Sequence, residues 1–217
     1  MRFKPILFNT DMVQAIIKWR KTQTRRIVKG MALNCLEHDM YSPEFVASSD
    51  LDLCDFGKVG DILWVRETFQ KHCTEMETTS DWAPISFKET GQYVYKADGY
   101  ILPKDSLSFS KWRPNIHMPK DACRIFLKVK SLRVERLQDI SEEDAVNEGI
   151  ERMPTVHWWK NYINKPLVGT SNAQHSFETL WQSINGKQSW DDNPFVWVIE
   201  FERVVLNSSE LNQFLNQ

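Results

Sequence analysis

A short basic segment carries the residue types that could do chemistry. Residues 19–26, Trp-Arg-Lys-Thr-Gln-Thr-Arg-Arg, place four cations and two hydroxyls in eight positions. Lys21 and Thr24 are three positions apart, so they would share a face of a helical turn, whereas on a straight strand they would point to opposite faces. A lysine can act as base for a neighbouring hydroxyl only when burial or nearby positive charge lowers its pKa. The arginines that could supply that charge are Arg20, Arg25 and Arg26.

The residues before this segment predict a rigid support. Met12, Ala15, Ile16 and Trp19 recur at i, i+3, i+4 and i+7, which predicts a helix from Asp11 to Trp19 with Thr10 or Asp11 as its cap. The basic run therefore begins where this helix ends. Cations at a helix C-terminus also complement the helix dipole, so a solvated basic surface is the alternative interpretation.

Glu148 is the candidate acid. Ser141-Glu142-Glu143-Asp144 resembles a capping box and predicts a short helix that ends at Glu148-Gly149, with Gly149 as a left-handed cap. A glutamate in the last helical turn opposes the dipole, so Glu148 suggests a partner cation, although an exposed glutamate would be equally ordinary.

Four further residues are candidates for binding a substrate. Trp64 and Glu67 lie in a run of β-forming residues, where Glu67 is a rival to Glu148 for the acidic role. Arg113 and His117 lie on a loop that prolines hold extended, and they could line a pocket. The alternative is that this loop only packs inward through Trp112 and Met118.

Composition limits the classes of function. The chain has 217 residues, a net charge of -2 and a pI near 6.2, which argues against nonspecific coating of nucleic acid. Its nine tryptophans could be core residues or stacking platforms. The four cysteines and five histidines are scattered, so we expect no metal site, no cofactor and no thiol redox motif. We also expect no signal peptide and no membrane span, which favours the cytoplasm.

The pattern predicts an α+β fold with a sheet able to curl into a small barrel. We expect a single domain over residues 1–206 and a polar tail at 207–217. Irregular insertions are expected near 30–56, 71–92 and 152–174. The expected strands are Lys4–Phe8, Ile62–Phe69, Tyr93–Ala97, Cys123–Leu137 and Phe195–Phe201, and a further helix is expected at Ser176–Ile184.

Four segments in this order resemble the ASCH domains of the PUA-like superfamily. They are Lys21–Arg26, Gly60–Leu63, the helix Ile140–Ile150 and Val198–Phe201, and the whole is similar to the longer, uncharacterised ASCH-domain proteins of phages and prophages. The resemblance implies a small PUA-like β-barrel with helices packed at its ends. It also implies a cleft beside the Lys-Thr segment and an interaction with RNA or nucleosides.

Two branches of that family imply different activities. One compact branch hydrolyses the acetyl amide of N4-acetylcytidine with a lysine, a threonine and a glutamate that match Lys21, Thr24 and Glu148. Another branch is described as a metal-independent ribonuclease. The chain departs from the family at Trp19, where a glycine is usual.

Three hypotheses follow from the sequence. The first is an amidohydrolase in which Lys21 is the base, Thr24 is the nucleophile, and Glu148 orients the lysine or shuttles a proton to the leaving amine. The second is a non-catalytic module for RNA or single-stranded nucleic acid, or a ribonuclease, in which the basic run contacts phosphates. The third is a structural or accessory protein with a decayed site. The sequence leaves the substrate and the oligomeric state open.

Overall fold

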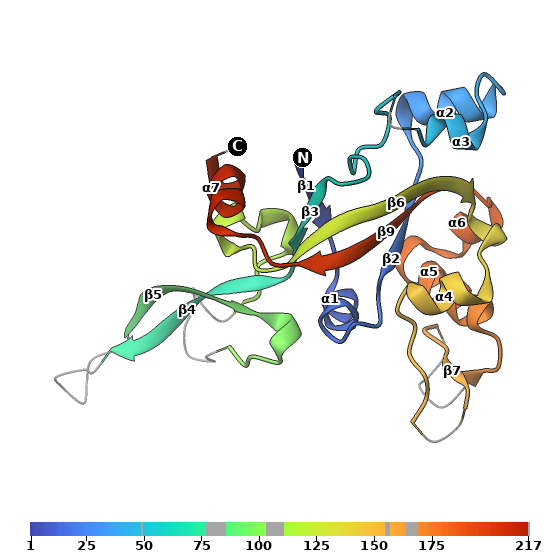
Figure 1. Cartoon of the computed structure of the whole chain (residues 1–217). Helices are drawn as coiled ribbons and strands as arrows, with labels where there is room; N and C mark the ends of the chain where they lie inside the picture. Colours follow the sequence, from blue (N-terminus) through green and yellow to red (C-terminus); the bar gives the residue numbers. More distant parts are fainter. Residues whose placement is uncertain (49, 77–85, 103–110, 155–156, 164–168, 217) are drawn as a thin grey trace. The chain divides into compact units, whose positions relative to one another are not determined.

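The computed structural model describes residues 1–48, 50–76, 86–102, 111–154, 157–163 and 169–216 (Figure 1). Its helices are α1 (Thr10–Ile17), α2 (Gly30–Glu37), α3 (Pro43–Val46), α4 (Glu142–Asn147), α5 (Ala173–Asn185), α6 (Lys187–Asp191) and α7 (Ser208–Asn216). Its strands are β1 (Phe3–Leu7), β2 (Gln23–Ile27), β3 (Ile62–Arg66), β4 (Phe69–Met76), β5 (Ser86–Tyr95), β6 (Phe126–Arg136), β7 (Trp159–Lys160), β8 (Gly169–Thr170) and β9 (Phe195–Val204). None of the helices in these ranges combines the length and apolar character needed to cross a bilayer.

The fold is mixed α+β, built on a five-stranded sheet with the order β1-β3-β6-β9-β2. The described strands do not close into the expected barrel, because β1 and β2 are the two ends of this order and do not pair with each other. Two-stranded sheets, β4-β5 and β7-β8, complete the strand pairing among the described residues.

The chain divides into two compact units, which we describe separately. The first unit contains residues 1–4, 15–63 and 127–204, and the second contains residues 5–14, 64–126 and 205–217.

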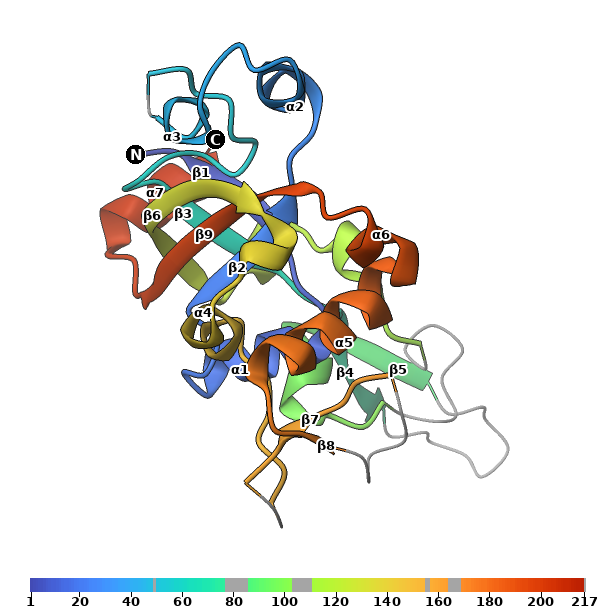
Figure 2. The same cartoon turned by 90° about the vertical axis from the view of Figure 1, so that its right-hand side faces the viewer.

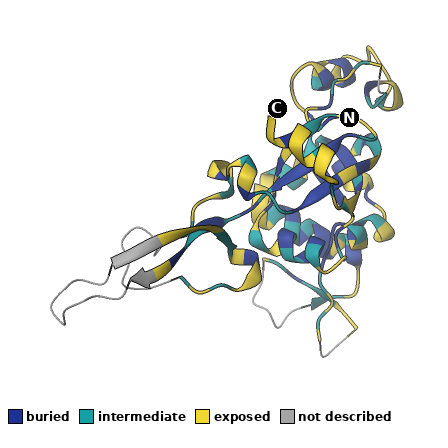
Figure 3. Cartoon of the chain, turned by 60° about the vertical axis from the view of Figure 1, so that its left-hand side comes forward, coloured by how far each residue is buried: buried dark blue, intermediate teal, exposed yellow. Residues whose placement is uncertain are grey.

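In the first unit, β9 is the buried strand predicted from its apolar run. Val196 to Ile199 are all buried, as expected for a strand covered on both faces. Figure 3 colours the chain by how far each residue is buried. It pairs antiparallel with β2, with Gln23 opposite Glu200 and Ile27 opposite Val196.

Helices α4 and α5 cover this part of the sheet, and they lie side by side in Figure 2. The apolar cluster that joins them to β9 is Leu137, Ile140, Ala145, Ile150, Ala173, Phe177, Trp181, Val196 and Val198. The predicted cap of α4 is confirmed, since Ser141 Oγ accepts from Asp144 N at 3.1 Å. Helix α5 begins before the predicted Ser176, because Asn172 caps it by accepting from His175 N at 2.8 Å.

Two of the three regions expected to be irregular contain regular structure, whereas the described part of 152–174 is mostly irregular, as expected. Residues 30–56 contain α2 and α3, and Ser42 caps α3. The predicted polar loop at 71–92 is largely a hairpin of β4 and β5, whose tip lies outside the described residues. Residues 152–174 contain the short pair β7-β8. The apolar residues of these helices and strands recur with weak periodicity. Backbone hydrogen bonds therefore define these elements, and no apolar pattern in the sequence marks them.

The second unit corrects the prediction of a polar tail. Residues 208–216 form α7, and Phe214 is buried with its ring centroid 5.6 Å from Trp64 and 5.1 Å from Phe126. The burial of this aromatic side chain anchors an otherwise polar helix.

Candidate functional site

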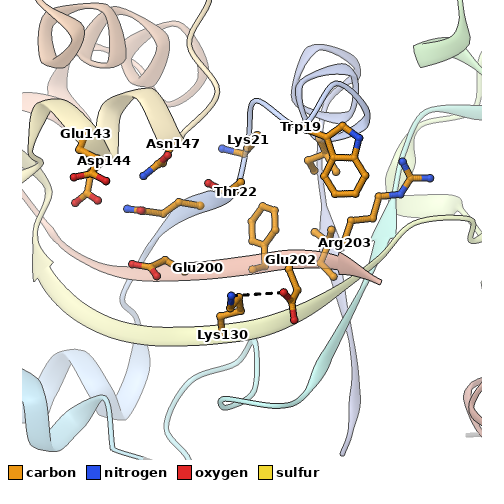
Figure 4. Close-up of a pocket in the computed structure, with 14 residues that line it drawn as sticks. Trp19, Lys21, Thr22, Lys130, Glu143, Asp144, Asn147, Glu200, Glu202 and Arg203 are labelled. Atoms are coloured by element: carbon orange, nitrogen blue, oxygen red, sulfur yellow. Dashed lines mark ion pairs between the residues drawn. The ribbon is translucent and has the colours of Figure 1, made fainter. Parts of the chain in front are cut away.

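A pocket of about 520 Å³ lies in the first unit, between the end of α1, the end of α4 and strands β6 and β9 (Figure 4). Its volume falls within the range typical of small-molecule sites. The lining residues are Ile16, Trp19, Lys21, Thr22, Gln23, Leu127, Lys130, Glu143, Asp144, Asn147, Glu200, Phe201, Glu202 and Arg203.

A buried ion pair between Lys21 and Glu148 is the chemical centre of this site. Lys21 Nζ donates to Glu148 Oε2 at 2.7 Å and to the Glu148 carbonyl oxygen at 2.8 Å. The two side chains are 0% and 4% exposed. The structure therefore supplies the partner cation that the position of Glu148 suggested, and it places the predicted lysine and glutamate together.

Burial lowers the pKa of Lys21 below its ordinary value of 10.5. The negative charge of Glu148 and its hydrogen bond oppose this shift, whereas the nearby positive charges of Arg26 and Arg25 add to it. Desolvation is the largest cause of the shift. At a given pH, the neutral amine is therefore a larger fraction of Lys21 than of an exposed lysine. A lysine in this state can accept a proton from a reacting group.

The end of α1 fixes the backbone that leads to Lys21. Trp19 N donates to Ile16 O at 3.0 Å and Arg20 N donates to Ala15 O at 2.8 Å, which is the pattern of a Schellman motif with Trp19 at C′. Lys21 then forms a bridge with Glu148, and Thr22 N donates to Asn147 O at 2.9 Å. The predicted cap of α1 is different, because Asn9 Oδ1 accepts from Met12 N at 2.9 Å.

Gly149 is confirmed as the left-handed residue after α4, with φ of +89°. A Cβ at this position would lie 2.8 Å from Lys21 Cβ and 3.1 Å from Ala15 Cβ. The glycine therefore allows the lysine segment to approach the end of α4 closely.

The structure does not bring Thr24 to the pair. Thr24 is buried on β2, opposite Ile199, and is absent from the pocket lining. Because side chains alternate along a strand, it points to the face opposite Gln23 and Arg25. Among the described residues no hydrogen bond joins its hydroxyl to Lys21 or Glu148. Thr22, which is exposed and lines the pocket, is the hydroxyl beside Lys21 in the chain.

Arg25 is held in a buried network of carboxylates. Its guanidinium donates to Glu148 Oε1 at 3.2 Å, to Glu135 Oε1 at 2.6 Å and to Asp144 Oδ2 at 2.9 Å. Arg133 donates to the same Asp144 oxygen at 2.6 Å. With its amide oriented to suit its neighbours, Gln23 donates to Asp144 Oδ1 and accepts from Arg25 Nη1. Arg25 therefore orients Glu148 and is fully enclosed.

The other two predicted arginines also face protein groups. Arg20 donates to Gly149 O at 3.2 Å and to Glu151 Oε1 at 3.0 Å, so it holds the segment after α4. The guanidinium carbon of Arg26 lies 5.9 Å from the centroid of the Phe56 ring, and burial lowers its pKa. Lys21 and Arg25 are therefore internal, whereas Arg20 and Arg26 are half-buried, and the alternative of a solvated cationic surface is wrong for Lys21 and Arg25.

The remaining candidates belong to the second unit. Trp64 is 7% exposed and packs on Phe214. Glu67 accepts two hydrogen bonds from Arg124, at 2.8 and 3.0 Å, and burial raises its pKa. Lys21 pairs with Glu148, and Glu67 is not among the residues that line the pocket.

Arg113 and His117 are both exposed. Arg113 forms a backbone bridge with Phe69, and His117 ends a 3-10 turn at Asn115–His117. The prolines of this loop therefore set up a turn and a bridge rather than one extended segment.

Most of the pocket lining escaped the sequence analysis. The residues that it missed include Thr22, Gln23, Lys130, Glu143, Asp144, Asn147, Glu200, Glu202 and Arg203. Only Asp144 and Glu143 carried a local signal, as members of the α4 capping segment. Asn147 ends α4 and Thr22 precedes β2. The others lie on strands where one face became the pocket wall, which a single strand pattern does not reveal.

The charge of the lining limits the ligand. Four carboxylates, Glu143, Asp144, Glu200 and Glu202, face three cations, Lys21, Lys130 and Arg203. Lys130 and Glu202 pair across the rim at 3.6 Å (Figure 4). A pocket of this composition favours an uncharged or cationic polar guest over a phosphate. Among the described residues, no group of three His, Cys, Asp or Glu side chains is placed to hold a metal ion.

Comparison of the chain with protein-family models, curated proteins and solved structures gave no match.

Proposed function

We propose that this chain is an ASCH-type protein of the PUA-like superfamily that removes an acyl group from a modified nucleoside, such as N4-acetylcytidine, in the cytoplasm. The observation that carries the proposal is the buried Lys21–Glu148 pair beside a pocket of about 520 Å³. A lysine with a lowered pKa, a carboxylate and a cavity of nucleoside size are the parts that such a hydrolysis requires.

In the proposed reaction, neutral Lys21 Nζ takes a proton from a water molecule while the water oxygen attacks the acyl carbon. The tetrahedral intermediate then collapses, the bond from carbon to the amide nitrogen breaks, and Lys21 returns its proton to the departing amine. The products are cytidine and acetate. Glu148 stabilises the ammonium that forms between the two steps, since its Oε2 lies 2.7 Å from Nζ.

Water is our choice of nucleophile because Thr24 lies on the opposite face of β2. The resemblance to ASCH domains assigns the role of nucleophile to Thr24. The Thr22 hydroxyl, which lines the pocket, is another candidate nucleophile. A threonine nucleophile would form an acyl-enzyme and give a burst of the first product, whereas direct attack by water gives none.

Binding of RNA by the basic run has less support. Arg25 is fully enclosed by Glu135, Asp144 and Glu148, so it has no donor group available for a backbone phosphate. The pocket lining carries more carboxylates than cations. Both observations disfavour the RNA-binding and ribonuclease alternatives, which rely on cations at the surface.

The proposal is tested by incubating the purified protein with N4-acetylcytidine and separating cytidine by liquid chromatography. We expect turnover by the wild-type chain and a loss of at least about 100-fold in Lys21→Met. Lys18→Met is the matched control, because Lys18 is an exposed lysine three residues earlier and should keep full activity. No cytidine from the wild-type chain between about pH 6 and pH 9 would overturn the proposal.

A further inference from the structure

Trp19 is an unfavourable residue at its position in the backbone. Its φ of +60° lies in the left-handed region, where glycine is the usual residue at the C′ position of a helix. For a bulky side chain this conformation is strained. The sequence therefore tolerates strain at Trp19, one of the two residues that separate α1 from the Arg20-Lys21 segment.

Packing within the first unit does not explain this choice. The Trp19 side chain is 67% exposed, so most of the indole lies in water rather than in a core. Strained residues persist where the surrounding structure or a ligand uses them. Since Trp19 lines the pocket, a contact with the pocket's guest is the use that its position indicates.

Arg203 extends the indole into a composite surface. Its guanidinium carbon lies 5.8 Å from the centroid of the Trp19 ring, and Arg203 also lines the pocket from β9. Indole rings and guanidinium planes are the groups on which proteins stack nucleobases. Figure 4 shows Trp19 and Arg203 near one another at one end of the pocket, with Glu143 and Asp144 at the other end.

The acidic end complements a ring that carries hydrogen-bond donors. Asp144 already accepts from Arg25 and Arg133, whereas Glu143 is exposed and makes no ion pair within the described part of the chain. A carboxylate in that position accepts from an amino or ring N–H group and repels a phosphate.

We propose that Trp19 and Arg203 form a stacking platform for the planar base of an uncharged nucleoside, and that the carboxylates opposite them select the nucleoside over its phosphorylated form. This inference rests on the proposed function, because it uses the same pocket and names the class of substrate. The platform adds recognition of the base to a site whose chemistry belongs to Lys21 and Glu148.

The test is a calorimetric titration of the full chain with cytidine and with cytidine 5′-monophosphate. Trp19→Gly should weaken cytidine binding at least about tenfold, because the base loses a stacking partner. The same change should leave Tm unchanged or raise it by roughly 2–4 °C, because glycine relieves the left-handed strain. A substitution that only disturbed the fold would lower both the affinity for cytidine and Tm.

Matched variants complete the design. Trp158→Ala removes another exposed tryptophan, one that is not part of the pocket lining, and should leave the affinity for cytidine within about twofold. Arg203→Gln removes an exposed cation and should weaken cytidine binding several-fold, which keeps the inference testable if Trp19→Gly does not fold. Cytidine 5′-monophosphate should bind the wild-type chain more weakly than cytidine.

Three results would overturn the inference: no binding of cytidine to the wild-type chain, equal affinity in Trp19→Gly, or tighter binding of the monophosphate. Nucleoside binding that depends on Trp19 without hydrolysis of N4-acetylcytidine would support the platform and refute the proposed reaction. Hydrolysis with an unchanged KM in Trp19→Gly would refute the platform and leave the reaction standing.

Discussion

Replacement of Glu148 by alanine should destabilise the protein strongly. Glu148 Oε2 lies 2.7 Å from Lys21 Nζ, and Oε1 lies 3.2 Å from Arg25 Nη1. Both cations are 0% exposed at the side chain, so bulk solvent compensates their charges poorly once the carboxylate is removed. Removing one member of a buried ion pair typically costs about 3–5 kcal/mol, since the remaining charge stays uncompensated.

For a chain of this size, about 1 kcal/mol corresponds to roughly 2–4 °C in Tm, so we expect Glu148→Ala to lower Tm by roughly 6–20 °C. Lys21 can relieve part of this cost by losing its proton, which places the expected value toward the lower end. Lys21→Met should cost much less. The substitution removes a desolvated ammonium, and Glu148 keeps its bond to Arg25.

The pH dependence of stability follows from the lowered pKa of Lys21. In the interval between its folded pKa and the ordinary value of 10.5, the unfolded chain binds more protons at this position than the folded chain. The contribution of Lys21 to the free energy of unfolding therefore rises with pH across that interval. Lys21→Met should abolish this contribution.

Thermal unfolding followed by circular dichroism measures the loss of Tm in Glu148→Ala and in Lys21→Met. Repeating the melts at neutral and at alkaline pH measures the contribution of Lys21 to the pH dependence of stability. The control is Glu143→Ala, which removes an exposed carboxylate from the same helix and should change the stability by less than about 0.5 kcal/mol. A cost below about 1 kcal/mol for Glu148→Ala would contradict the reasoning, because it would mean that the buried charges of Lys21 and Arg25 do not depend on this carboxylate.

Two further predictions concern the neighbours of the pair. Thr22→Val should reduce turnover of N4-acetylcytidine. Thr24→Val should leave kcat/KM within about threefold, because of these two threonines only Thr22 lines the pocket. If the wild-type chain gives a burst of cytidine and Thr24→Val abolishes it, Thr24 is the nucleophile. Gly149→Ala should destabilise the fold by about 2–4 kcal/mol in a thermal melt, since the left-handed backbone is strained and the new Cβ would lie 2.8 Å from Lys21 Cβ. Gly99→Ala is the control, because Gly99 is left-handed with φ of +76° and has no atom within 4 Å, so a similar loss there would show that the contact with Lys21 is unimportant.

Local signals predicted the parts of the site that depend on neighbours in sequence. The cap at Ser141, the left-handed Gly149 and the need of Glu148 for a cation all follow from the chemistry of helix ends. The buried run of β9 follows from its composition. These features required no knowledge of how distant segments meet.

Long-range contacts account for most of what the sequence could not reveal. Arg25 meets Glu135 and Asp144, which lie 110 and 119 residues further along the chain. No local pattern separates such an arginine from a solvated one, so the sequence left a solvated basic surface open as the alternative. Strand β2 likewise begins at Gln23 because it pairs with β9, and this pairing turns Thr24 away from the pocket.

The protonation state of Lys21 is the central claim, and nuclear magnetic resonance can measure it without a substrate. In protein labelled with ¹³C at lysine Cε, the Lys21 signal is the one that disappears in Lys21→Met. We predict that it titrates below the ordinary lysine value of 10.5 and shifts lower still in Glu148→Gln, because Glu148 raises the pKa of Lys21. A Lys21 that titrates at or above 10.5, or that does not respond to Glu148→Gln, would contradict its assignment as the base.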